Sequence, residues 1–379
     1  MQLYPWQQRA LLEPNDYALW CCEAGTGKTF AGNLWLEQKD RMKNAVILGP
    51  KQIRGMWLER KPDAHYFTPQ TILKEELPSN PTAILIDEID MFGAPLFVGK
   101  KRSKCAERLY NYIRSNPQAH VLGITATPVR STPWNMHTIL TYIGRYIDFK
   151  EYRSTYFSLQ FLPYLPRPAY IAVIGWQKMM QPLIDKHAVV ALMRDMVDVL
   201  PPETYEVINL KSPKYEKNEE WEAIKQFVAD HRMEQFTKST EISRLARGYR
   251  KVVVVAHYRE QIDELRAKLS KERETFVLDG RTTDATSIIA DAEDSPECYF
   301  IIQASVGAGF DLHTFSCMIF ASQGYSARNY VQMKARIRRI SSLKPVVYYH
   351  LLGGRCDRLI KKAIDLGLDF IPSEYLAID

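Results

Sequence analysis

The chain has 379 residues, of which 46% are hydrophobic and 25% are charged, as is usual for globular proteins that fold in water. Lysine and arginine outnumber aspartate and glutamate by 50 to 44, and this net charge of +6 permits a nucleic-acid partner without requiring one. No apolar run approaches the roughly 18 residues of a membrane span, the first residues lack the regions of a secretory signal, and the six cysteines include no C-x-x-C pair. We therefore expect two or three domains in a reducing intracellular compartment, the cytoplasm.

The first expected strand and helix flank a glycine-rich turn. Residues 17–22 are a short apolar run typical of a buried strand, and residues 30–38 have helical spacing. Between them, Gly25–Thr29 reads G-T-G-K-T, which is the end of a phosphate-binding loop pattern with Cys22 in place of its first glycine. Such a loop holds phosphates on backbone N–H groups, and its lysine and threonine reach the β- and γ-phosphates and Mg²⁺. The alternative is an ordinary turn with a solvated lysine.

Two carboxylates follow a later apolar run. Residues 45–48, 66–68 and 83–86 are expected strands, and the last of these leads directly into Asp87 and Glu88. Ligands bind at the carboxyl ends of parallel strands. Asp87 is therefore suited to bind Mg²⁺, and Glu88 to position and deprotonate an attacking water. The alternative is that Asp87 only caps a helix.

Three further stretches of the first half are candidates for binding. Gln7 lies 20 residues before Gly27, and its amide can match the donor and acceptor edge of adenine. Residues 99–104 are basic and either clamp nucleic-acid phosphates or form a solvated face. Residues 119–124 are another expected strand, and Thr125 after it can hydrogen-bond between the acidic loop and a bound strand. This alternation of strands and helices predicts a RecA-like, doubly wound domain.

The alternation breaks between about residues 149 and 176, where aromatic residues and prolines gather. These aromatic residues either form a surface that stacks bases or pack an inserted subdomain, and we favour packing. Residues 178–200 look helical, and Pro201 and Pro202 would end that helix. We place the domain boundary there.

The second half again alternates strands and helices. Expected strands cover residues 251–256, 299–302, 318–320 and 345–352, and residues 261–269 have the pattern of an amphipathic helix. No second phosphate loop occurs in this half. We therefore expect a second domain of the same class.

Two motifs of the second half favour a role at a triphosphate. Residues 307–312 follow a strand, and their glycines allow close approach of the backbone to a ligand. Residues 329–339 are predicted to form a helix in which Gln332, Arg336 and Arg339 share one face. This is either a basic helix without a special role or the source of an arginine finger, which can supply roughly 10³–10⁵ in rate.

Taken in order, these stretches resemble the motif series of superfamily 2 helicases and, within that superfamily, of Snf2-type ATPases. The segments that carry the resemblance are 3–7 (Q-motif), 25–29 (motif I), 49–51 with Trp57 (Ia), 87–90 (II), 125–128 (III), 251–257 (IV), 307–312 (V) and 332–339 (VI). The stretches at 192–194, 199–204 and 345–349 look like the Snf2 members of the superfamily. The resemblance covers nearly the whole chain.

The resemblance implies an α/β protein with two RecA-like domains and parallel sheets. The N-terminal domain would cover residues 1–148, an inserted subdomain and linker 149–202, and the C-terminal domain 203–379. ATP would bind between the domains with Mg²⁺. The implied residues are Gln7, Gly25, Thr26, Gly27, Lys28, Thr29, Gly309 and Asp311 for the nucleotide, Thr29 and Asp87 for the metal, and Lys28, Glu88, Arg336 and Arg339 for catalysis.

The same resemblance implies ATP-driven translocation on DNA, with duplex or branched DNA favoured and single strands possible. The implied nucleic-acid contacts are Lys51, Lys100, Lys101, Lys104, Thr125, Arg130 and His257. We expect no membrane partner and activity as a monomer, with replication or recombination proteins as further candidate partners. The open alternatives are an RNA-dependent ATPase or RNA helicase, with which Asp90 is compatible, the motor subunit of a restriction complex, and a catalytically inactive scaffold.

Overall fold

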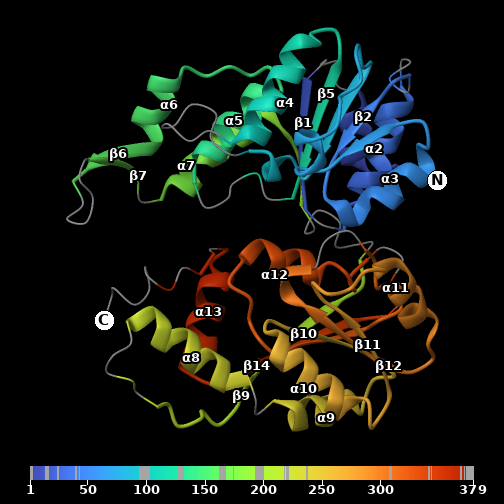
Figure 1. Ribbon diagram of the computed structural model, residues 1–379, viewed down its shortest axis with the longest axis vertical. Coiled ribbons are helices and arrows are strands. Elements are labelled where there is room, and N and C mark those ends of the chain that lie inside the picture. The colour runs from blue at the N-terminus through green and yellow to red at the C-terminus, as the bar shows by residue number, and fades with distance from the viewer. Residues whose placement is uncertain are drawn as a thin grey trace. The chain divides into compact units, whose positions relative to one another are not determined.

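The chain folds into two compact units, which comprise residues 1–195 and 196–379 (Figure 1). Among the described residues, no helix is both long enough and apolar enough to cross a membrane. The computed structural model describes residues 3–12, 17–23, 25–38, 41, 43–93, 103–126, 128, 132–161, 168–173, 175–192, 200–216, 218, 222–235, 238–306, 310–339, 342, 344–367, 369–370 and 372.

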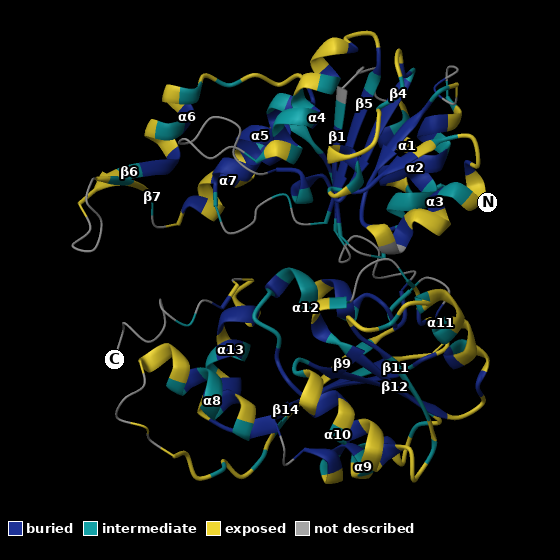
Figure 2. Cartoon of the chain, viewed as in Figure 1, coloured by how far each residue is buried: buried dark blue, intermediate teal, exposed yellow. Residues whose placement is uncertain are grey.

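The first unit is built on a six-stranded parallel sheet with strand order β3-β2-β4-β5-β1-β8. Its central strands are buried on both faces, which is why they are continuous apolar runs (Figure 2). The strands are β1 (Tyr17–Cys22), β2 (Val46–Leu48), β3 (His65–Phe67), β4 (Ala83–Asp87), β5 (His120–Thr125) and β8 (Val189–Ala191). The helices are α1 (Pro5–Leu12), α2 (Lys28–Glu37), α3 (Arg54–Arg60), α4 (Lys104–Ser115) and α5 (Trp134–Tyr142), with 3-10 turns at Lys51–Ile53, Thr71–Leu73 and Ile89–Met91.

An arm of two helices and a hairpin lies between β5 and β8 in the chain. It consists of α6 (Phe149–Tyr156), the antiparallel strands β6 (Phe157–Gln160) and β7 (Ala169–Ala172), and α7 (Trp176–His187). Figure 1 shows α6 and the hairpin extending away from the sheet of the first unit. The chain then returns to that sheet, because β8 pairs with β1.

The second unit repeats the design with strand order β11-β12-β10-β13-β14-β9, again entirely parallel. The strands are β9 (Glu203–Asn209), β10 (Lys251–Ala256), β11 (Glu274–Leu278), β12 (Cys298–Gln303), β13 (Cys317–Phe320) and β14 (Val346–Leu352). The helices are α8 (Ala223–Gln235), α9 (Ser239–Ala246), α10 (Arg259–Leu269), α11 (Ala285–Asp294), α12 (Ala327–Lys334) and α13 (Arg355–Asp365), with a 3-10 turn at Ala304–Val306. The predicted α/β class with parallel sheets is confirmed.

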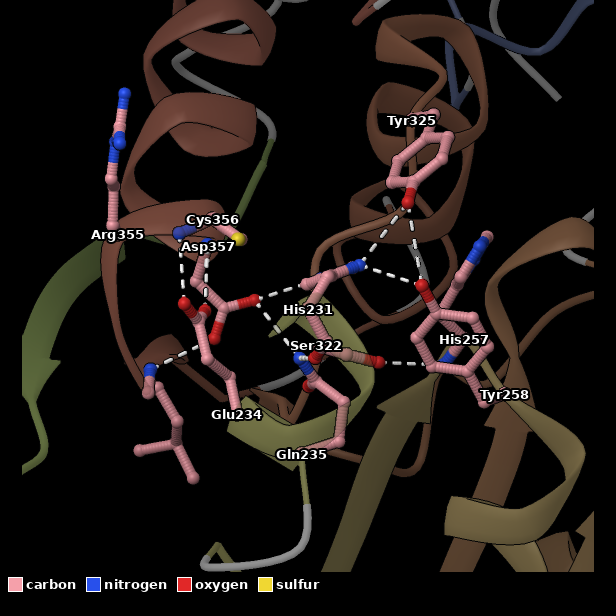
Figure 3. A network of polar contacts seen from close by, with 12 residues as sticks. His231, Glu234, Gln235, His257, Tyr258, Ser322, Tyr325, Arg355, Cys356 and Asp357 are labelled. Carbon is pink, nitrogen blue, oxygen red and sulfur yellow. Dashed lines mark hydrogen bonds and ion pairs between the residues drawn. The ribbon is translucent and has the colours of Figure 1, made fainter. Parts of the chain in front are cut away.

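A buried polar network joins α8 to the start of α13 in the second unit (Figure 3). The Asp357 carboxylate accepts hydrogen bonds from Lys238 Nζ (2.5 Å), Gly353 N (2.8 Å) and Gln235 Nε2 (3.3 Å), and it contacts His231 Nε2 at 3.1 Å. Lys238 and Asp357 are fully buried. Because a buried charge is tolerated only when it is paired, this network fixes the position of α13 against α8.

Two expected helices differ from the structure. The helix expected over residues 178–200 ends at His187, and Val189–Ala191 form β8 instead. The β-branched valines there pair with β1 and extend the sheet, a long-range contact that local spacing does not predict. The helix expected over residues 329–339 ends at Lys334. Arg336 lies beyond that end, where its carbonyl accepts a hydrogen bond from Leu312 N at 3.0 Å.

Candidate functional site

The glycine-rich turn follows β1 and leads directly into α2, as the sequence predicts. Gly25 and Gly27 have φ angles of 92° and 85°, in the left-handed region that favours glycine. A Cβ atom at Gly27 would lie 2.8 Å from Gln7 Nε2, so a larger residue there would displace the Gln7 amide and strain the backbone. The N-cap residue of α2 is Gly27, which has no side chain to cap the helix. The N-terminal N–H groups of α2 therefore remain available for an anion.

Residues of α1 fix this turn from one side. Trp6 Nε1 donates a hydrogen bond to Thr26 O at 3.1 Å, and Gln7 Nε2 donates to Gly27 O at 3.3 Å. Gln7 Oε1 accepts from Tyr4 N at 3.0 Å, and the Gln7 residue is only 1% exposed. Both ends of this amide are thus engaged inside the unit. The structure gives Gln7 a role in holding the loop, and its contact with adenine stays a prediction.

Two carboxylates lie at the carboxyl end of β4, close to the turn. Lys28 Nζ is 3.4 Å from Glu88 Oε1, and both side chains are largely buried. Glu88 has φ 55° and ψ 51°, a left-handed conformation that is unfavourable for a residue with a side chain and often marks a functional site. Asp87 Oδ1 accepts from Glu88 N at 3.0 Å, and Asp87 Oδ2 accepts from Trp57 Nε1 at 3.0 Å.

Lys28, Asp87 and Glu88 form a cluster of closely spaced, buried charges that influence one another. Burial raises the pKa of the Asp87 carboxyl to about 6; Lys28 opposes the rise, the Glu88 carboxylate adds to it, and the Trp57 hydrogen bond opposes it. A cation near Asp87 would favour its ionised form. The site is therefore suited to a positively charged ligand beside the carboxylates and a negatively charged one beside Lys28.

Asp87 and Thr29 fit the requirements of Mg²⁺. Both offer oxygen ligands, and Mg²⁺ is commonly held by one or two carboxylates together with substrate phosphates and water. The described part of the chain contains no group of three or more histidine, cysteine, aspartate or glutamate side chains placed to hold a metal. A site of this kind would thus depend on the phosphates of a bound nucleotide.

Thr125, at the end of β5, connects to the acidic loop. Its Oγ1 donates a hydrogen bond to Asp90 Oδ1 at 2.9 Å, as expected for the loop side of its predicted role. The Thr125 side chain is completely buried. The structure therefore places the Thr125 hydroxyl inside the unit, and its contact with a nucleic-acid backbone stays a prediction.

In the second unit, the segment at 310–312 contacts the two arginines that follow α12. Arg339 Nη2 pairs with Asp311 Oδ1 at 2.5 Å, and Arg336 Nη1 donates to Phe310 O at 2.9 Å. Arg336 is buried, whereas Asp311 is exposed. The shared helix face predicted for Gln332, Arg336 and Arg339 is wrong, because α12 ends before either arginine.

The remaining residues predicted to contact nucleic acid differ in how exposed they are. Lys51 and Lys104 are exposed on the first unit. His257 is half-buried, and its ring lies against those of His231, Tyr258 and Tyr325. Burial lowers the pKa of His257 to about 4, with His231 and Arg232 adding to the effect, so His257 offers no positive charge to a phosphate at neutral pH. Lys100, Lys101, Arg130 and Gly309 lie outside the described residues.

Two tryptophans were not expected to act at this site. Trp6 holds the Thr26 carbonyl, and Trp57 donates to the Asp87 carboxylate. Indole N–H groups usually find a partner when they are buried. That rule could have predicted a hydrogen bond for each tryptophan, but the sequence does not identify the acceptors.

The sequence was also compared with known proteins. No model of a known protein family matches the chain, and a search of curated proteins finds no significant match. The functional argument therefore depends on the geometry of the site and on the motifs.

Proposed function

We propose that the first unit binds ATP with Mg²⁺ and hydrolyses its terminal phosphate, and that the chain is a DNA-dependent translocase or helicase of superfamily 2. The observation that carries the proposal is the contact of Lys28 Nζ with Glu88 Oε1 at 3.4 Å, beside the glycine turn and Asp87. A lysine, a strained glutamate and a second carboxylate at one helix N-terminus form the parts needed for phosphoryl transfer to water.

Each residue has a definite task in this proposal. The N–H groups at the start of α2 and the Lys28 ammonium bind the phosphates, and the Thr29 hydroxyl and Asp87 carboxylate hold Mg²⁺. Mg²⁺ neutralises charge on the phosphate oxygens when it is bound. A phosphate beside Lys28 replaces Glu88 as its partner, which leaves the Glu88 carboxylate to orient a water and accept its proton.

Arg339 is the better candidate for the arginine finger. The Arg336 guanidinium donates to the Phe310 carbonyl and lies over the Phe310 ring at 5.3 Å. Arg339 instead pairs with the exposed carboxylate of Asp311, a partner that a phosphate can replace. The choice of DNA over RNA comes from the resemblance alone. Asp90 does not distinguish the two, because its carboxylate is bonded to Thr125 inside the unit.

The test is steady-state ATP hydrolysis by the full chain, first alone and then with single-stranded, duplex and forked DNA and with RNA. We expect Lys28→Ala to abolish turnover and Glu88→Gln to lower it by about 10²–10⁴ while ATP still binds, because only the base is lost. Glu59→Gln, an exposed change on α3, is the matched control and should retain the wild-type rate.

The outcomes distinguish the proposed DNA translocase from its alternatives. Stimulation by duplex or forked DNA supports the proposed translocase, and stimulation by RNA alone supports the RNA-dependent alternative. Normal hydrolysis by Glu88→Gln would show that another group is the base. If the wild-type chain neither binds nor hydrolyses ATP, the proposed function is wrong.

A further inference from the structure

The arm of the first unit is firmly anchored at the end nearest the sheet. The Phe157 ring stacks on Trp134 with centroids 4.0 Å apart, and the Tyr152 hydroxyl donates to Pro133 O at 2.5 Å. Tyr156 and Trp176 are buried in the same core. These residues fulfil the expectation that the aromatic stretch packs a subdomain, and they fix where the hairpin begins.

The outer part of the hairpin has a different character. Leu159 and Tyr170 are cross-strand partners, so their side chains lie on one face of the ribbon, the face to which Phe157 also belongs. Leu159 is 54% exposed, Tyr170 is 41% exposed, and Phe161, directly after β6, is 83% exposed. A two-stranded ribbon has little stability of its own in water. Packing therefore does not explain why these three side chains are apolar.

The charge around this face is positive. The Arg153 guanidinium lies 4.4 Å from the centre of the Tyr170 ring, and within the described part of the chain no carboxylate forms an ion pair with it. Residues 152–184 contain no aspartate or glutamate, although 44 of the 379 residues are acidic. Lys178, on α7, adds a further exposed cation to the arm, and the exposed acidic residues of the arm, Glu151 and Asp185, lie on α6 and α7 outside the hairpin. A polyanion is the partner that this charge distribution attracts.

We propose that Leu159, Phe161 and Tyr170, together with Arg153, form a stacking face that binds single-stranded nucleic acid. Aromatic rings stack on any base and arginine meets the phosphates, which gives binding without sequence preference. The hairpin itself contains no acidic residue, which suits a nucleic acid better than a protein partner, whose interfaces usually pair charges of both signs. The inference rests on the proposed function and deepens it, because it names the form of nucleic acid that the first unit holds.

The experiment measures binding by the full chain in the absence of nucleotide. Fluorescence anisotropy is recorded with a labelled oligothymidylate of about 20 nucleotides, longer than the roughly 4–16 nucleotides of a typical site, and with a duplex of the same length. We expect Phe161→Ala and Tyr170→Ala each to weaken single-strand binding by about 10-fold, because each change removes the ring on which one base stacks. Phe161→Trp keeps a stacking ring and should bind as tightly as the wild type.

The matched control is Leu12→Ala on α1, which removes a similarly exposed apolar side chain (80%) from the same unit. This variant should bind both ligands normally, and the hairpin variants should lose less than about 2-fold on duplex DNA. Each changed residue is exposed or half-exposed, so the fold should be retained, and circular dichroism checks this.

Several results would overturn the inference. One is an unchanged single-strand affinity in both alanine variants; another is an equal loss on the duplex and the single strand. A third is loss of self-association in the variants without any effect on oligothymidylate, which would mark a protein interface. Failure of the proposed function is seen separately, because a chain that never hydrolyses ATP can still bind oligothymidylate through the stacking face.

Discussion

Replacing Asp357 by asparagine should destabilise the second unit far more than removing a surface ion pair of the same length. Asp357 Oδ2 accepts from Lys238 Nζ and Gly353 N, while Asp357 Oδ1 contacts His231 Nε2 and Gln235 Nε2. Either orientation of an asparagine amide would direct an NH₂ group toward a group that already donates, which is Gln235 Nε2 on one side and Lys238 Nζ with Gly353 N on the other. The Lys238 ammonium would also be left buried without its anionic partner.

The size of the effect follows from burial. Breaking a buried ion pair by removing one partner costs about 3–5 kcal/mol. The control is Asp365→Asn, which removes the partner of Lys361 at an N–O distance of 2.5 Å, the same as in the Lys238–Asp357 pair. Because the Asp365 side chain is 52% exposed, this change should cost under about 1 kcal/mol.

Urea unfolding of the full chain, followed by circular dichroism, gives the free energy of unfolding for both variants. Hydrogen exchange then shows where the loss occurs, and α8 and the start of α13 should exchange fastest in Asp357→Asn. If the free energies of unfolding of the two variants lie within about 1 kcal/mol of each other, the reasoning is refuted, because burial would then not decide the cost of losing an ion pair.

Two further changes test single contacts. Trp57→Phe keeps a buried aromatic ring but removes the donor to Asp87 Oδ2. The Mg²⁺ concentration for half-maximal ATP hydrolysis should therefore rise about 10–100-fold. An unchanged Mg²⁺ requirement would show that Trp57 does not position the carboxylate. Burial lowers the pKa of His350 to about 3, aided by Lys361 and Lys334. From about pH 6.5 downward the unfolded chain therefore binds the proton first, and the free energy of unfolding should fall by up to about 1.4 kcal/mol per pH unit. His350→Phe, which keeps the ring stacked on Phe320, should flatten the urea-unfolding profile between about pH 7 and pH 5; an equally steep profile would assign the slope to other groups.

The parts of the fold that could be predicted are those that depend on short stretches of consecutive residues. The strands β1, β4 and β10 are apolar because both faces of each parallel sheet are buried. The glycine turn was predictable for a related reason: left-handed φ angles at Gly25 and Gly27 require that residue type. Both features depend on a few consecutive residues, which is all that a single sequence displays.

The parts that could not be predicted depend on contacts between distant residues. Strand β8 is defined by pairing with β1, more than 160 residues earlier in the chain. The end of α12 depends on the segment near Leu312, whose N–H bonds to the Arg336 carbonyl. In the hairpin, local sequence shows that aromatic residues gather but not that Phe157 is buried while Phe161 is exposed.

The two cations proposed to act on a triphosphate share one physical arrangement. Lys28 lies 3.4 Å from Glu88, and Arg339 lies 2.5 Å from Asp311, so each cation contacts a carboxylate of its own unit. Exchanging a carboxylate for a phosphate replaces one anion by another, which avoids leaving either cation desolvated and unpaired. The exchange would have an additional consequence at Lys28, because it would free Glu88 for its proposed role as a base. Binding of the phosphate and activation of the water would thus be coupled through one lysine, and neither would be complete without the other.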